Sequence, residues 1–484
     1  MGVSLNPSTI LSGQGIDVSS VVSQIISEQS GQLTVWQEQQ TTLATQDGLL
    51  EGEENNLTNL QTAVAALADP SGALTAQAAT SSNAGVLTAT AQNSAIAGTH
   101  QIEVTSLATT GTLFTGPIAA GADRSFLSSG QTTGDIQLQV GGVSGTTHDI
   151  PITQGSNDTL NTLASYINTQ STANGWGVTA SVVSDLSGSR LSLQSQSSGS
   201  TGALAIVNDS NTTLTFDAPE GGTNAVLNID GVPFSSATNT VSGAIQGVTL
   251  NLVSQAPGSP VQLTVGPDQN QITNAVNNFV SAYNTVVSTI NSQYIVDPTG
   301  ATPAPPLESD LSLRSLQSSM LTDAAYAIGG NSGDVNLASL GINMNDDGTL
   351  TVGSNASGQT FAQVLAANPS AVQSFFQNSS GTGFANNFNT DLTNLTNPTT
   401  GPLNVDLAQN EAEDTDLTTT ITNFQNQLTT ETTALTSRYD AVNASLQAYP
   451  LLLQEVTETL GTLGSGTSST GSLISSEPTL TSGL

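Results

Sequence analysis

Apolar side chains recur every seven residues near both ends of the chain, and no other feature restricts its possible folds as strongly. In the N-terminal part the row consists of Trp36, Leu43, Leu50, Leu57 and Val64. In the C-terminal part it consists of Ile421, Leu428, Leu435, Val442, Tyr449, Val456 and Leu463. A seven-residue repeat keeps its members on one face of a helix and is typical of helices that pack lengthwise. We therefore predict helices at both ends, with their seams buried against each other.

The N-terminal seam is half polar, because Gln40, Asp47, Glu54 and Gln61 occupy its alternate positions. Such side chains fill a core poorly, so we expect this helical face to be only partly buried in one chain and to contribute to a homo-oligomer. In the C-terminal helix, Pro450 should kink or divide the helix, because proline has no backbone N–H to donate.

A separate short helix is expected before this seam. Asp17 is a plausible N-cap, and Gly31 marks a break from the longer helix that follows. Because that break detaches the short helix from the main seam, we expect its apolar residues to form a partner or oligomer interface rather than core. These residues are Ile16, Val21, Val22, Ile25 and Ile26.

The middle of the chain changes from helical to strand periodicity. Between about residues 76 and 266 apolar and polar residues alternate, and Asp230-Gly231 is a hairpin signal. One short helix is expected from Asn157 or Asp158. A longer helix should begin at Asp268, and its apolar stripe runs to Ile290.

These patterns predict an α+β multidomain chain in which N- and C-terminal helices form a coiled-coil-like leg, with β-rich domains inserted between them. The expected parts are 1–30, a mobile N-terminal docking helix; 31–75, the N-terminal leg helix; 76–115 and 217–266, two parts of an inner β domain; 116–216, an outer β-rich domain; 267–403, a helical leg domain with a β-hairpin; 404–463, the C-terminal leg helices; and 464–484, a disordered tail.

Composition excludes several classes of function. The chain has 37 acidic residues, four Arg, no Lys and a net charge of −33, so it cannot neutralise a run of phosphates and no nucleic-acid partner is expected. Without Lys or Cys it has no P-loop lysine, Schiff base, cysteine nucleophile or thiolate metal site. No basic signal-peptide region and no run of 18 apolar residues is present, so we expect neither a cleaved signal nor a membrane span.

Three motifs could suggest chemistry, but each has a simpler interpretation. Asn343, Asn345 and Asp347 imitate half of an EF-hand loop, yet Ser354 stands where the bidentate Glu belongs, so a hairpin turn is expected. The acidic cluster at 51–54 should be a solvated helix face, and His148-Asp149 has no nucleophile context. We therefore predict no enzyme activity and no catalytic, cofactor or metal site.

Several segments, taken in order, resemble the family of the flagellar filament cap, flagellar hook-associated protein 2. They are Gly15-Ile-Asp-Val-Ser-Ser-Val-Val-Ser-Gln-Ile-Ile26, Gly98-Thr-His-Gln-Ile-Glu-Val-Thr-Ser-Leu-Ala108, Asn228-Ile-Asp-Gly231 and Leu337-Ala-Ser-Leu-Gly-Ile342. The stretch from Thr159 to about Phe216 is similar to the repeat inserted in flagellins and hook proteins. The resemblance covers about 15–463, but the family's helical end usually carries several Lys residues and this chain has none.

The resemblance implies a structural function outside the cell. Such a protein would leave the cell unfolded through the flagellar export apparatus, served by an export chaperone, with residues 1–30 as an export and docking segment. A ring-shaped homo-oligomer at the filament tip would help flagellin fold and polymerise and prevent subunits from leaking away. Flagellin and the hook–filament junction proteins would be its partners.

Two alternative functions remain compatible with the sequence. The β domains could bind surface ligands, which would make the protein a flagellar tip adhesin and a factor in cell adhesion. The chain could also be another flagellar axial protein, such as a hook–filament junction protein, although the segment 15–26 favours the cap.

Overall fold

The structure, a computed structural model, describes residues 16–119, 121–295, 299, 303–329, 335–378 and 380–464, with side chains to residue 462. The described chain divides into two compact units. The first unit combines parts of 1–58, 285–320 and 392–484, and the second combines 59–284 with 321–391. Each unit is therefore assembled from segments that are far apart in the sequence. No described helix is both long enough and apolar enough to cross a membrane.

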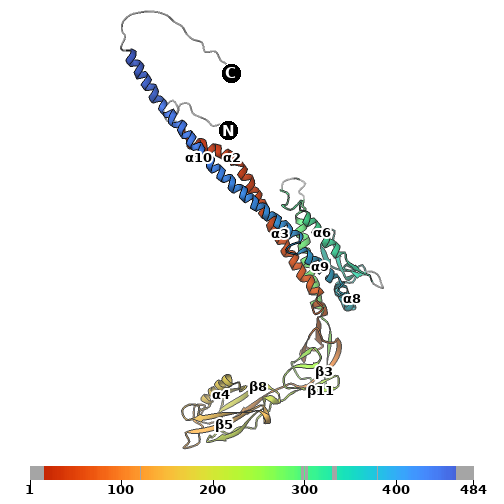
Figure 1. Cartoon of the computed structure of the whole chain (residues 1–484). Coiled ribbons are helices and arrows are strands. Elements are labelled where there is room, and N and C mark those ends of the chain that lie inside the picture. Colours follow the sequence, from red (N-terminus) through yellow and green to blue (C-terminus); the bar gives the residue numbers. More distant parts are fainter. Residues whose placement is uncertain are drawn as a thin grey trace, which may run out of the picture. The chain divides into compact units, whose positions relative to one another are not determined.

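Helices from both ends of the chain belong to the first unit, which also includes residues 285–320. They are α2 (Val18–Gln29), α3 (Gly31–Ala68) and α10 (Pro402–Gly464), and Figure 1 shows α2 and α3 alongside α10. The predicted caps and breaks determine where these helices begin: Asp17 accepts a hydrogen bond from the Ser20 backbone N–H, and α2 ends before Gly31. The predicted division at Pro450 is wrong, since α10 continues through that residue.

The inner β domain of the second unit contains two antiparallel sheets. Their strand orders are β1-β14-β3-β10-β11 and β12-β13-β2. The strands are β1 (Gln77–Ser81), β2 (Leu87–Ala91), β3 (Gly98–Ser106), β10 (Ala225–Ile229), β11 (Val232–Ser236), β12 (Thr240–Ile245), β13 (Val248–Leu252) and β14 (Val261–Pro267). Asp230 and Gly231 form the predicted turn between β10 and β11, with φ angles of 52° and 87°. Alternate residues of the strands meet in one core that includes Ile102, Leu227 and Leu250.

The outer β domain has a separate core and its own two sheets. Their orders are β4-β8-β7 and β6-β5-β9. The strands are β4 (Thr110–Phe114), β5 (Thr133–Val140), β6 (Thr146–Thr153), β7 (Val178–Asp185), β8 (Gly188–Ser198) and β9 (Leu204–Ser210). The helix α4 (Leu160–Asn174) contributes Leu163 and Ile167 to the core, and its N-cap is Thr159 rather than the predicted Asn157 or Asp158. Because β4 pairs with β8, this domain begins at Thr110, before the predicted boundary at 116.

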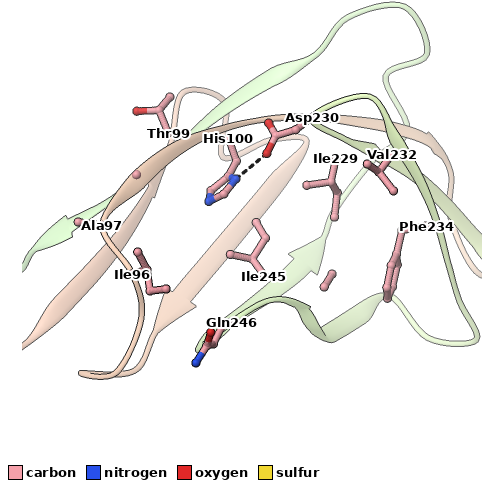
Figure 2. A pocket seen from close by; sticks show the side chains of 12 residues that line it. Ile96, Ala97, Thr99, His100, Ile229, Asp230, Val232, Phe234, Ile245 and Gln246 are labelled. Carbon is pink, nitrogen blue, oxygen red and sulfur yellow. Dashed lines mark hydrogen bonds and ion pairs between the residues drawn. The ribbon is translucent and has the colours of Figure 1, made fainter.

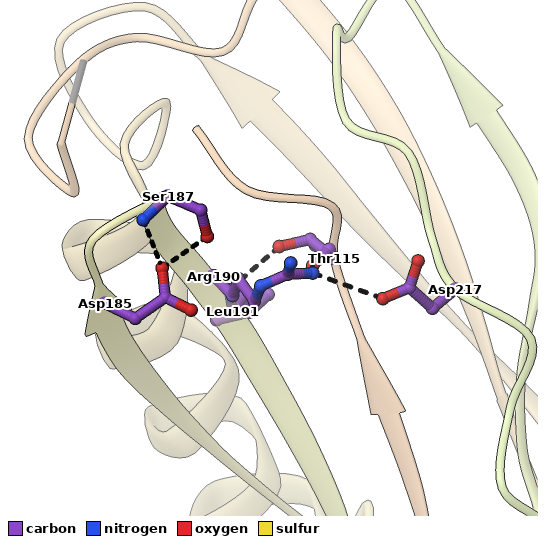
Figure 3. A network of polar contacts seen from close by, with 6 residues as sticks. All are labelled: Thr115, Asp185, Ser187, Arg190, Leu191 and Asp217. Carbon is purple, nitrogen blue, oxygen red and sulfur yellow. Dashed lines mark hydrogen bonds and ion pairs between the residues drawn. The ribbon is translucent and has the colours of Figure 1, made fainter. Parts of the chain in front are cut away.

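A polar network ties the start of β8 to neighbouring segments of the outer domain (Figure 3). The Arg190 guanidinium donates to the Thr115 carbonyl at 3.2 Å and meets the Asp217 carboxylate at 3.3 Å. The buried Thr115 hydroxyl accepts from the Leu191 N–H at 2.9 Å. Arg190, one of the four arginines of the chain, therefore links β8 to the segments around Thr115 and Asp217.

Shorter helices and two small hairpins complete the chain. The helices are α5 (Gln269–Ser292), α6 (Leu311–Ala324), α7 (Phe361–Ala367), α8 (Pro369–Phe376) and α9 (Phe384–Leu395). The hairpins pair β15 (Ala327–Ile328) with β16 (Val335–Asn336) and β17 (Ile342–Met344) with β18 (Leu350–Val352). Asp268 caps α5 as predicted, by accepting from the N–H groups of Asn270 and Gln271. In the second unit, Phe279 of α5 packs edge-on against Phe384 and Phe388 of α9, at 5.5 and 6.2 Å.

Candidate assembly surface

Four of the five members of the seven-residue apolar row of α3 are buried. Leu43 is 7% exposed, Leu50 1% and Leu57 and Val64 0%, whereas Trp36 is half-buried. On α10, Ile421 and Leu428 are buried and Leu435 is half-buried. The rings of Trp36 and Phe424 meet edge-on at 5.3 Å, which joins the two helices in the first half of α10. The two ends of the chain thus share a seam within one molecule.

The polar row of α3 is also used within the chain. Gln40 donates to the Asp414 carboxylate at 3.0 Å. In the opposite direction, the Asn410 amide donates to Asp47 at 2.8 Å and the Asn404 amide donates to Glu54 at 2.7 Å. The residue numbers of the partners decrease along α10 as those on α3 increase, so the two helices run antiparallel. This repeated pairing, here named the amide–carboxylate ladder, satisfies carboxylates with neutral donors, and the single-helix sequence pattern could not reveal it.

The short helix α2 continues the seam instead of standing apart. Val21 and Val22 are buried and Ile16, Ile25 and Ile26 are half-buried, while the Ile16 N–H donates to the Asn443 side chain of α10 at 2.7 Å. Gln29 donates to Glu431 at 2.9 Å. Within this chain Val21 and Val22, which were expected at a partner interface, are covered by α10, because α10 extends past the break at Gly31. The rest of the predicted docking segment, 1–15, lies outside the described residues.

The seven-residue row of α10 leaves the seam after Leu435. Val442 is 47% exposed, Tyr449 64% and Val456 50%, so these three residues do not lie in a buried seam, contrary to the prediction. The side chain of Leu463 lies outside the described residues. An α-helix turns a seven-residue row by about 20° per heptad relative to a straight contact line. On this part of α10 the half-buried residues instead include Tyr439, Asn443 and Leu446, and Asn443 accepts the hydrogen bond from the Ile16 N–H.

An apolar stripe lies exposed on α10 beyond the contact with α2. Tyr449, Leu453, Val456 and Leu460 share one helical face at spacings of three to four residues, and each is at least half exposed. Leu451 and Leu452, which lie outside the seven-residue row, add to the exposed apolar surface. Monomeric soluble proteins rarely expose contiguous apolar surface of this kind.

The motifs with possible chemistry have structural roles. Asn345, Asp347 and Gly348 form the β17–β18 turn, where Asp347 accepts from the Thr349 N–H at 2.9 Å. His148 stacks on Trp176 with ring centroids 4.8 Å apart, and Asp149 accepts from Gln137. Among the described residues, no three histidine or acidic side chains gather closely enough to hold a metal ion.

Glu53 does not lie on a solvated face as predicted. It is 1% exposed, and burial raises its pKa to about 7. The reason is that α3 packs on more than one side, since Glu53 and Leu60 are buried beside the seven-residue row. Glu54 is half-buried in the ladder and Glu51 alone of the three is exposed.

The inner β domain has a cavity of about 520 Å³ with a mostly apolar lining (Figure 2). Ile96, Val232 and Phe234 contribute to its wall, and the His100 ring meets the Asp230 carboxylate at 2.7 Å at its side. This hydrogen bond, with one from the Gln101 N–H, lowers the pKa of Asp230. The pair fixes the β10–β11 turn against β3.

The chain matches family models over most of its described length. Residues 14–111 match the N-terminus of flagellar hook-associated protein 2, and residues 222–449 match the C-terminus of the same family. Between them, residues 135–197 match the flagellin hook IN motif, which lies within the outer β domain.

Individual relatives agree with these matches. The chain is 30% identical over 375 residues to the B-type flagellar hook-associated protein 2 of Pseudomonas aeruginosa, which covers 71% of this chain and 75% of the relative. It is 38% identical over 69 residues to flagellar hook-associated protein 2 of Salmonella typhimurium, 14% of each chain. A crystal structure of the flagellar cap protein from Escherichia coli has a similar fold, with a TM-score of 0.55 and 24% identity over 75% of this chain and 99% of that one.

Proposed function

The chain belongs to the flagellar hook-associated protein 2 family, and we infer that it functions as the structural cap of a bacterial flagellar filament. The family matches at both ends support this function over that of a hook–filament junction protein. The architecture agrees with it, because helices from the two chain ends pair while the β domains lie between them in sequence. The family is structural, and its place is at the flagellum.

The exposed apolar stripe of α10 supports an oligomeric cap. Tyr449, Leu453, Val456 and Leu460 lie on one face with no part of the described chain covering them. We assign this face to contact with further copies of the same chain, which would form a ring at the filament tip. Such a ring would retain flagellin while it folds and polymerises. The hook–filament junction proteins would be further partners of the ring.

Export belongs to the same proposal. A cap at the filament tip has to travel there through the flagellar export apparatus, in unfolded form and with a chaperone to prevent premature association. The exposed stripe of α10 is the kind of surface that needs such protection before assembly. The protein would then fold and act outside the cell.

The test is a double substitution in the stripe, Leu453→Asn with Leu460→Asn. We expect the melting curve of the monomer to be unchanged, because both side chains are already exposed. Rings seen by electron microscopy, and rescue of motility in a strain without its own cap, should be lost.

Gln454→Asn is the matched control, since Gln454 is exposed on the same turn but is polar. It should form rings and support motility like the unmodified protein. Normal rings and normal motility in the double variant would contradict the assignment of this face to subunit contact.

A further inference from the structure

Two carboxyl groups face each other in the second unit, away from the helical seam. Asp323 lies at the end of α6 and Asp391 lies within α9. Both side chains line one cavity of about 330 Å³, and the interaction with Asp391 helps to raise the pKa of Asp323. Two ionised carboxylates in one cavity repel each other, and they can hydrogen-bond to each other only when one of them holds a proton, so this arrangement favours one shared proton.

The surroundings favour the protonated form of this pair. Phe384 and Phe388, each 1% exposed, line the same cavity together with Tyr326. The Oδ2 atom of Asp323 is buried and has no hydrogen-bond partner in the described structure. Burial is the largest cause that raises the pKa of Asp323, to about 7, and the hydrogen bond and charge of Asp391 act in the same direction.

The groups that interact electrostatically with Asp323 come from two neighbouring helices and include no cation. Asp391 faces it from α9, and the buried Tyr283 interacts with it from α5. Burial and the Asp323 charge both raise the pKa of Tyr283, so this phenol stays neutral across the physiological range. Arg314, which is on α6 as well, instead lies over the ring of Tyr294 at 5.3 Å. Ionisation of both carboxyls would therefore place two negative charges in one cavity without compensation.

We propose that Asp323 and Asp391 form a proton-operated latch between α6 and α9, closed by one shared proton in a mildly acidic medium and loosened when that proton leaves. The balance is simple: the closed latch holds one proton and one negative charge, and opening in neutral solution releases the proton to solvent.

The sign of the pH dependence follows from the two protonation states. The folded protein holds the shared proton up to a pH of about 7, whereas an unfolded Asp releases it near its ordinary pKa of 3.8. The folded state binds more protons between these values, so its stability falls as the pH rises from about 4 to about 7 and then levels off. The inference does not rest on the cap function, because it concerns only the packing of α6 on α9.

Peptide-resolved hydrogen exchange of the full chain at pH 5 and pH 8 tests the latch. After correction for the intrinsic pH dependence of exchange, protection of α6 and α9 should be at least about tenfold higher at pH 5, since one pKa unit corresponds to a factor of ten. In the Asp323→Asn variant an amide replaces the proton donor at every pH, so the ratio should fall to the smaller value that other buried acids such as Glu53 impose.

Asp346→Asn is the control, because Asp346 is an exposed acid of the same unit and should keep the wild-type ratio. Asp391→Asn removes the same pair from the other helix and provides a second reading if Asp323→Asn folds poorly. A wild-type ratio near one, or a tenfold ratio that persists in both variants, would overturn the proposal.

Discussion

Packing, and not polarity, determines the burial of Glu53. Its Oε2 atom accepts from the Asn56 amide at 3.0 Å, but its Oε1 atom is buried without a partner in the described structure. The Asn56 amide also reaches the Thr289 hydroxyl at 3.4 Å, which places the group at a contact between α3 and α5. Burial raises the pKa of Glu53 to about 7, so the folded state retains a proton that the unfolded state releases near 4.5. Stability from this residue is therefore present below about pH 4.5 and is lost as the pH approaches 7.

The substitution Glu53→Gln keeps the shape of the side chain and removes its ionisation. We expect the unfolding free energy to become less dependent on pH between 5 and 8, by roughly 1–3 kcal/mol, with the variant the more stable protein at pH 8. Thermal melts across that range measure the effect. Glu51→Gln, on an exposed position of the same helix, should leave the pH profile unchanged. If both variants follow the wild-type profile, burial of Glu53 has no influence on its protonation.

At the scale of elements, the amide–carboxylate ladder sets the register of α3 against α10. Asp47 and Glu54 accept from Asn410 and Asn404, while Gln40 donates to Asp414. Hydrogen bonds with one charged partner contribute more than neutral ones, and a mismatch leaves a half-buried carboxylate without a donor. The ladder thus gives the carboxylates of α3 and α10 hydrogen-bond donors in a chain that has no lysine to pair with them.

Asn410→Asp tests the ladder by placing a second carboxylate opposite Asp47. The hydrogen bond is lost and like charges meet, so we expect a loss of about 1–3 kcal/mol at pH 7. Gln409→Asp adds the same charge at the neighbouring exposed position and should cost little. Denaturant unfolding followed through Trp36, whose ring contacts Phe424 in the same seam, measures the difference. Equal losses in the two variants would mean that net charge, and not register, governs the pairing.

At the scale of the whole molecule, the chain builds separate cores and joins them through paired segments. The outer β domain has its own core around Leu138, Leu163 and Leu193 and shares none of its buried residues with the inner β domain. Its two connections leave at neighbouring points, because the Thr109 N–H donates to the Thr223 carbonyl at 2.9 Å. A domain inserted in this way can change its surface while the helical seam stays intact.

Deletion of residues 110–222, with a short glycine linker from Thr109 to Thr223, tests this independence. We expect the remaining chain to keep its helical circular dichroism signal and its cooperative melting, because the gap between the joined residues is already closed by hydrogen bonds. A deletion that starts at 116 is the comparison. Its melting should be less cooperative, because it leaves β4 without its partner β8. Loss of helical structure in the first variant would show that the inner domain depends on the outer one.

The sequence by itself determined the features that rest on local chemistry. The seven-residue rows identified α3 and the first half of the α10 seam, Asp17 and Asp268 identified helix starts, and Asp230-Gly231 identified the β10–β11 turn. Each depends on a periodicity or a hydrogen bond within a few residues, which the chain carries wherever it folds. The ordered family motifs likewise indicated the flagellar cap family.

Only the tertiary structure decided which faces of these helices are covered. Val21 and Val22 are buried because α10 reaches past Gly31, Val442 and Tyr449 are exposed because a straight helix turns its seven-residue row away from the contact line, and Glu53 is buried because α3 also packs outside the seam. The ladder and the Asp323–Asp391 pair join residues tens to hundreds of positions apart. Burial and pKa depend on these distant neighbours, and a pattern within one helix contains no information about what is packed against it.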